Sequence, residues 1–245
     1  MTISRFLRPE IFSHIPQLVA GISTRHGGVS SQAYRSLNLG IHTDDDPSAI
    51  SQNLSLFCSD LGISPGSLAR SFQVHGDQIW QASHTGYING FDAIISDSLG
   101  IFAGVGIADC CPILLADPVR QSVAAIHAGW KGTVQEIVRK TVAQMVYNGS
   151  KPDDILAYVG PCISLEHFEV GDEVAEQFEF KEKRGARWHV DLKATNVAQL
   201  QDIGVSQIEI SDYCTVKNND LFYSHRNEKG ITGRMLAVIG FQRRG

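Results

Sequence analysis

The sequence is organised around the stretch from Ile101 to Thr133, which alternates apolar runs with residues able to bind metals or do chemistry. Short apolar runs bounded by Gly, Pro and Asp are typical of buried strands. The runs 101–108 and 122–126 are each followed at once by such side chains: Asp109, Cys110, Cys111 and His127. Proteins with α/β folds place reactive groups on loops at strand ends. The stretch therefore predicts buried strands with a functional site at one edge.

Composition limits the class of protein. A chain of 245 residues, 43% of them hydrophobic, can bury a full core, and no linker is visible, so we expect a single domain over 1–245. A net charge of −5 with dispersed Lys and Arg argues against a nucleic-acid partner. Without a membrane-length apolar run or a signal-peptide pattern, we expect a cytoplasmic protein with no membrane partner. The five cysteines contain no C-x-x-C pair, which argues against a disulfide framework.

The same patterns predict the other elements. Strands are expected at 18–24, 70–74, 91–96, 112–116, 155–159, 205–211 and 235–241, with 78–82 returning as the hairpin partner of 70–74. Helices are expected from Asp46 to Gly62, from the 129–133 turn through the apolar stripe 134–146, over 171–183, and from Asp191 to Gly204. The acidic run 44–46 is interpreted as a helix cap rather than a metal site.

Three side chains at predicted strand ends suggest a metal site. His75, Cys110 and His127 offer two imidazoles and a thiolate, and zinc prefers such N and S donors in a tetrahedron with the fourth position left open. Asp109, next to Cys110, could orient one of these metal ligands without binding the metal itself. The spacing of the three residues along the sequence matches no zinc finger. The prediction therefore rests on their common position at the ends of predicted strands.

The same residues allow other chemistry. Cys110 could act as a nucleophile with His127 or His75 as its base. Two His and one Cys also suit copper, although a blue-copper site uses a weak axial ligand and the chain has no His-x-His pair for a multicopper centre. A non-catalytic module stabilised by zinc is the third alternative.

Several segments are candidates for binding anions. Arg25 opens a turn with Gly27 and Gly28 whose backbone N–H groups can face an anion, and the helix that opens near Gly132 offers its N-terminus. Arg226 and Arg234 could bind phosphate or pair with surface carboxylates, and pairing is slightly favoured.

Taken together, these segments resemble the YfiH/laccase-domain family over nearly the whole chain. The resemblance is carried, in the family's order, by Thr24–Ser30 (TRHGGVS), Ser36–Gly40 (SLNLG), Gln73–Gly76 (QVHG), Ala108–Cys110 (ADC), His127–Gly132 (HAGWKG), Gly160–Ile163 (GPCI), Cys214–Thr215 and Thr232–Arg234. It implies an α+β fold, a single-domain layered α/β/β/α sandwich with mixed sheets. It also implies that His75, Cys110 and His127 are metal ligands.

The family carries two competing labels, purine nucleoside phosphorylase (with adenosine deaminase and methylthioadenosine phosphorylase activities) and polyphenol oxidase (laccase). We expect the first, with Zn2+ as cofactor, a purine nucleoside and phosphate as partners, and a monomer or small homo-oligomer; a copper-dependent (Cu2+) phenol oxidase is the alternative. The expected catalytic residues are Cys110, His127 and Asp109, and the expected substrate-binding residues are Arg25, Asn38, Gln73 and Lys131. Asn38 and Gln73 can give and accept hydrogen bonds with a sugar or purine edge.

Overall fold

The computed structural model describes residues 4–243, which build two six-stranded sheets and one three-stranded sheet. The first sheet has the order β1 (Phe6–Leu7), β2 (Leu18–Ser23), β15 (Met235–Phe241), β7 (Phe102–Ile107), β3 (Leu68–Phe72), β5 (Gly86–Asn89). The second has the order β14 (Gln207–Ile210), β10 (Leu156–Val159), β8 (Cys111–Asp117), β9 (Ser122–Ala128), β6 (Ala93–Ser96), β4 (Ile79–Gln81). Both sheets mix parallel and antiparallel pairs.

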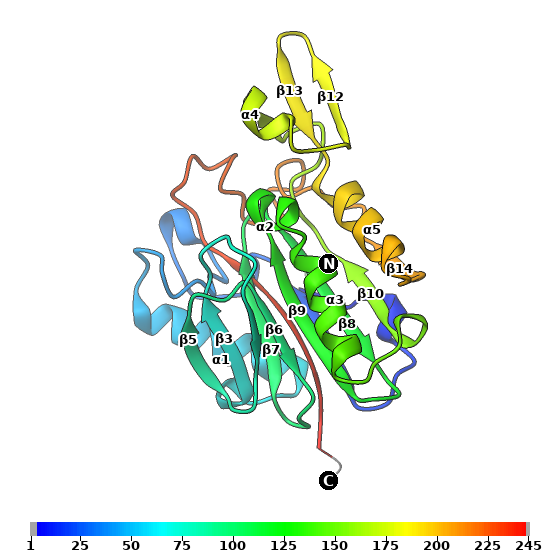
Figure 1. Cartoon of the computed structure of the whole chain (residues 1–245). Helices are drawn as coiled ribbons and strands as arrows, with labels where there is room; N and C mark the ends of the chain where they lie inside the picture. The colour runs from blue at the N-terminus through cyan, green and yellow to red at the C-terminus, as the bar shows by residue number, and fades with distance from the viewer. Residues whose placement is uncertain (1–3, 244–245) are drawn as a thin grey trace.

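The helices cover the outer faces of the two large sheets, except for the four-residue α4, which lies beside the small three-stranded sheet (Figure 1). They are α1 (Pro47–Leu61), α2 (Trp130–Val134), α3 (Ile137–Tyr147), α4 (Asp172–Ala175) and α5 (Leu192–Asp202), with single 3₁₀ turns at Glu10–Phe12, Gln32–Tyr34, Pro65–Ser67 and Pro152–Asp154. One apolar cluster lies between the sheets, a second joins the second sheet to α3 and α5, and a third joins the first sheet to α1. The predicted layered α/β/β/α sandwich with mixed sheets is confirmed.

Strands β8 and β9 form the buried centre of the second sheet. Every residue of both strands is buried, and the antiparallel register pairs Pro112 with His127. Cys110 immediately precedes β8, so this register brings it beside the end of β9. The strand pattern read from 101–128 therefore positions the candidate site through ordinary antiparallel pairing.

Two sequence predictions were wrong, one about which strand pairs with β3 and one about the length of a helix. Strand β4 is not the hairpin partner of β3, because it lies in the second sheet beside β6, whereas β3 pairs with β7 and β5 in the first. The turn after β3 thus crosses between sheets. The helix expected over 171–183 is limited to α4, and 181–184 forms β12 instead. A stretch of charged residues fits an exposed strand as well as a helix face, and here cross-strand pairing decides.

The helix expected after the 129–133 turn is broken into two. Glu136 has φ 59° between α2 and α3, which ends the first helix and redirects the chain. The apolar stripe is still used, since Ile137, Val142 and Met145 are buried against the second sheet.

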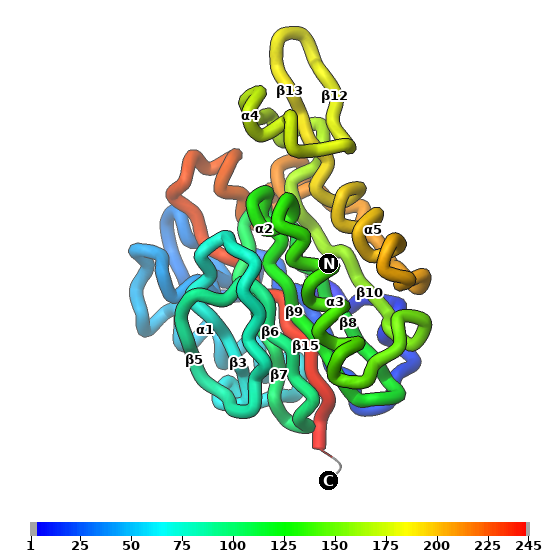
Figure 2. Tube along the Cα trace, viewed as in Figure 1, coloured from blue at the N-terminus to red at the C-terminus, as the bar shows by residue number. Residues whose placement is uncertain are grey.

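A small sheet stands apart from the sandwich. It consists of β11 (Glu169–Val170), β13 (Arg187–Val190) and β12 (Lys181–Arg184), and the tube in Figure 2 shows β12, β13 and α4 projecting beyond α2. Within residues 4–243, every helix is too short or too polar to cross a membrane.

Candidate metal centre

Three side chains from separate segments of the chain, two loops and one strand, meet at one end of the sheets. The donor atoms of His75, Cys110 and His127 all lie within 4.8 Å of one another. His75 follows β3, Cys110 lies between β7 and β8, and His127 is in β9. The two imidazole rings are 4.9 Å apart between centroids and nearly perpendicular. A separation of this size lets one ion contact all three donors.

Asp92, just before β6, holds this arrangement together. Its fully buried carboxylate accepts hydrogen bonds from the backbone N–H groups of Val74, His75 and Gly76 at 2.8 to 3.1 Å. It also lies 2.8 Å from Nδ1 of His127, and the His127 N–H donates to its backbone carbonyl. A carboxylate at Nδ1 fixes the ring and leaves Nε2 directed at the site, which is the usual support for a metal-binding histidine.

The electrostatics of the site favour a thiolate beside an imidazolium when no ion shares them. Burial raises the pKa of the Cys110 thiol, but the charge and hydrogen bonds of His127 and His75 outweigh it and lower that pKa to about 6. Burial lowers the pKa of His127, and Cys110 and Asp92 together raise it. Because a metal ligand must be deprotonated, an ion binding here would displace the proton of His127.

The surroundings of the three donors fit a metal ion. Two nitrogens and one sulfur are the donor set of catalytic zinc sites that leave one position open. Gly129 lies directly against them: a Cβ there would come within 3.1 Å of Sγ of Cys110 and 3.3 Å of Cδ2 of His75. The missing side chain keeps this space free beside the donors.

Backbone strain also marks the site. His75 and Asp109 have φ values of 58° and 85°, which non-glycine residues rarely adopt. Such conformations persist where the surrounding contacts enforce them and cluster at functional sites. The Asp109 carboxylate accepts from the hydroxyl of Thr215 at 2.5 Å and from the backbone N–H of Arg226 at 2.7 Å.

The three donors lie in the wall of a cavity of about 490 Å³. That volume falls within the range of small-molecule sites, roughly 300–1,000 Å³. The lining includes three guanidinium groups, those of Arg70, Arg226 and Arg234. It also includes the aromatic rings of Phe72, Tyr87, Trp130 and Phe168. A cationic and aromatic pocket beside the donors suits an anionic or nucleobase-containing ligand.

The predicted substrate-binding residues are only partly brought together. Gln73 lines the cavity, but its amide is engaged by the backbone N–H and C=O of Gly106 at 2.8 Å each. Lys131 is exposed and lies outside the lining, 5.6 Å from the Trp130 ring.

Arg25 and Asn38 also lie outside the cavity lining. The Arg25 guanidinium pairs with Glu228 at 3.0 Å, and the buried Asn38 side chain is bonded to Thr43, Asp45 and nearby backbone N–H groups. Both side chains are engaged within the protein, and their predicted contact with a substrate stays a prediction.

Arg226 and Arg234 line the cavity, and neither forms a salt bridge among residues 4–243. Arg226 donates to the carbonyls of His167 and Glu169, and Arg234 donates to those of Thr232 and Gly233. The slightly favoured carboxylate pairing is therefore wrong, because backbone carbonyls take that place.

The remaining sulfur groups lie away from the cavity lining. All five cysteines are free thiols, and Cys111 and Cys162 are fully buried in the cluster between the second sheet and its helices. Met145 is buried in the same cluster, and Met235 lies between the sheets. Cys111 points away from its neighbour, as alternation predicts.

Comparison with known proteins matches these features to one family. The sequence model described as multi-copper polyphenol oxidoreductase laccase matches residues 19–242. A protein of Deinococcus radiodurans named purine nucleoside phosphorylase is 43% identical over 91% of this chain and 88% of its own. Escherichia coli purine nucleoside phosphorylase YfiH is 36% identical over 89% of this chain and 91% of its own.

A solved structure agrees with the sequence comparisons. YlmD from Geobacillus stearothermophilus superposes with a TM-score of 0.93 at 30% identity, covering 99% of this chain and 98% of its own. The fold, the full-length family match and the relatives named YfiH and YlmD agree, and the chain belongs to the YfiH/laccase-domain family.

Proposed function

We propose that this protein is a zinc-dependent purine nucleoside phosphorylase acting on inosine or adenosine, with methylthioadenosine as a further substrate and adenosine deamination as a side activity. The main support for this proposal is the His75–Cys110–His127 group in the wall of a cavity that is also lined by arginine side chains and aromatic rings. The names of the relatives support this reading.

The proposed roles follow from the contacts. His75, Cys110 and His127 would hold the ion, which would supply Lewis-acid polarisation of a substrate oxygen when bound. Asp109 would keep the strained turn before β8 in place, since both carboxylate oxygens are bonded to Thr215 and Arg226. Because both carboxylate oxygens already accept these hydrogen bonds, we assign Asp109 a positioning role rather than contact with the substrate.

Cations near the donors would attract phosphate. Arg234 is half-buried, and burial lowers its pKa from the ordinary value while the charges of Cys110 and Asp109 raise it. Arg226 lies 5.5 Å from the Phe168 ring and lines the same cavity. Arginine groups held by carbonyls present their remaining N–H groups in fixed directions, which suits an oxyanion.

The deciding experiment compares His127→Ala with wild type. We expect phosphate-dependent release of hypoxanthine from inosine in the wild type and a loss of roughly 100-fold or more in the variant. Removing only the partner of a metal ligand already costs about 10–100-fold. His14→Ala, an exposed histidine outside the cavity lining, is the matched control and should keep full activity. Equal turnover in His127→Ala and wild type would refute the metal mechanism.

Copper-dependent phenol oxidation is the second candidate, because the donor set and the name of the family model both allow it. It predicts oxygen uptake with a phenol only after copper loading. The absence of a methionine from the cavity lining argues against a blue-copper centre among the described residues. Metal analysis of protein purified without added metal, beside both assays, separates the two candidates.

A further inference from the structure

The cavity extends from the metal centre onto the outer face of the first sheet, where Arg70 lines it. Arg70 lies on β3, opposite Gly104 on β7 and Tyr87 on β5. Among residues 4–243, its guanidinium forms no salt bridge and donates no hydrogen bond to the protein. Arg70 is half-buried, and its guanidinium has no protein partner in the cavity, so its N–H donors are available to an anionic ligand.

The environment of Arg70 is partly desolvated and shaped. Burial lowers the pKa of Arg70 from its ordinary value, while the neighbouring Tyr87 and Cys58 raise it. Gly104 and Gly106 leave the β7 surface without side chains, and a Cβ at Gly104 would come within 3.3 Å of Cγ of Arg70. The space over β7 is therefore kept open beside the guanidinium.

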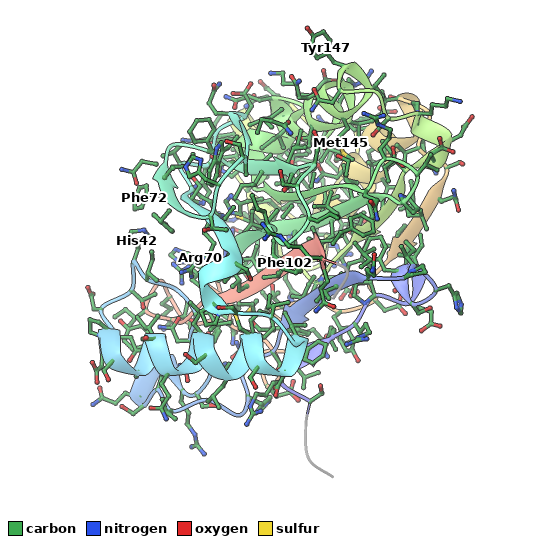
Figure 3. All side chains as sticks on the ribbon, turned by 90° about the horizontal axis from the view of Figure 1, so that it is seen from below. His42, Arg70, Phe72, Phe102, Met145 and Tyr147 are labelled. Carbon is green, nitrogen blue, oxygen red and sulfur yellow. The ribbon has the colours of Figure 1, made fainter. Side chains whose placement is uncertain are left out.

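An aromatic wall borders the same space. The Tyr87 ring lies 5.9 Å from the guanidinium carbon, and the Tyr87 hydroxyl is 2.7 Å from Nε2 of His42. His42 in turn packs edge-on to Phe72 at 4.3 Å. Figure 3 shows His42, Arg70 and Phe72 on one side of the molecule, with Arg70 above helix α1. Flat rings next to a cation suit a ligand that combines a planar group with an anion.

Arg70 differs in this respect from the other two arginines of the cavity. Arg226 and Arg234 each donate two hydrogen bonds to backbone carbonyls, so part of their donor capacity is used within the protein. Arg70 keeps all five N–H donors for a ligand. Its fork matches a phosphate or carboxylate oxygen pair.

We propose that Arg70 is an oxyanion-binding residue at the end of the cavity formed by the first sheet, and that it selects ligands carrying a phosphate group. The inference rests on the proposed function for the identity of the substrate. The phosphate has two sources, inorganic phosphate as cosubstrate or the 5′-phosphate of a nucleotide such as inosine 5′-monophosphate. The chemistry at Arg70 is the same in both.

The test uses Arg70→Met, which removes the charge at similar length, and Arg70→Lys, which keeps the charge but not the fork. Titration calorimetry on the zinc-loaded protein measures binding of inorganic phosphate, inosine and inosine 5′-monophosphate, alongside KM and kcat for phosphorolysis. We expect Arg70→Met to weaken either phosphate or the nucleotide about 10- to 100-fold, as for one charge-assisted hydrogen-bonded pair, with inosine unchanged. Arg70→Lys should recover part of this loss.

The two sources give different results. A raised KM for phosphate with kcat preserved assigns the inorganic ion, and a selective loss of nucleotide binding with unchanged phosphate KM assigns the 5′-phosphate. Unchanged affinity for both anions in Arg70→Met and Arg70→Lys would overturn the proposal and leave Arg70 a packing residue. Arg120→Met, an exposed arginine outside the lining, is the control. Because binding is measured directly, a protein without phosphorylase activity still tests Arg70.

Discussion

At the scale of single residues, Asp92 is the strongest test of how the metal centre is held. We expect Asp92→Asn to weaken zinc binding by about 10–100-fold, because the carboxylate orients His127 and fixes the turn that carries His75. An asparagine would direct N–H donors at backbone N–H groups, and breaking this buried pair costs about 3–5 kcal/mol of folding free energy. Chelator competition and urea unfolding measure the two effects.

Asp97→Asn is the matched control for Asp92, since Asp97 lies just beyond the other end of β6 and bonds Gln81 and Ser122 away from the cavity. It should leave zinc affinity unchanged. Equal zinc affinity in Asp92→Asn and wild type would show that the ring of His127 needs no carboxylate to keep its orientation.

The residues of the site were predictable to different degrees. His75, Cys110 and His127 were singled out because each follows a predicted strand, and strand ends gather at sheet edges. Asp92 was missed because it lies within the predicted apolar strand 91–96 and was counted as part of that strand. An acidic residue in such a strand must be buried with partners, and this signal was not used. Arg70 was missed because its partners Gly104 and Tyr87 come from other strands, and only the sheet order brings them together.

At the scale of elements, the start of α1 depends on one cap. Asp46 accepts from the backbone N–H of Ser48 at 2.9 Å, and Pro47 follows at the first helical position. We expect Asp46→Ala to cost about 1 kcal/mol of unfolding free energy, which lowers Tm by about 2–4 °C in a chain of this length. Asp44→Ala, an exposed neighbour in the same acidic run, should change Tm by less. Equal losses in both variants would indicate a charge effect rather than a cap.

Local signals identified most elements but not their partners. The cap at Asp46 and the αL glycine Gly62 bound α1 as the sequence indicates. The 75–77 turn resembles a hairpin turn, yet the Asp92 carboxylate binds its N–H groups and directs the chain into the other sheet. Pairing across sheets is decided by contacts distant in sequence, which a local pattern does not contain.

At the scale of the whole molecule, the cores are independent of the metal centre. Three apolar clusters join the four layers, and none contains a donor side chain of the site. We therefore expect removal of the ion by a chelator to abolish phosphorolysis while far-UV circular dichroism stays unchanged. Free zinc at 100 times its Kd stabilises the fold by about 2.7 kcal/mol, so Tm should fall by about 5–10 °C when the ion is removed.

The His127→Ala variant supplies the control for this experiment, because a protein that no longer holds the ion tightly should show little change in Tm on chelation. Re-adding zinc to the wild type should restore both Tm and activity. Cooperative unfolding at 25 °C on chelation would instead favour the zinc-stabilised binding module. In that case the ion would contribute to the fold itself, as in small metal-dependent domains, despite the extensive apolar layers on both sides of each sheet.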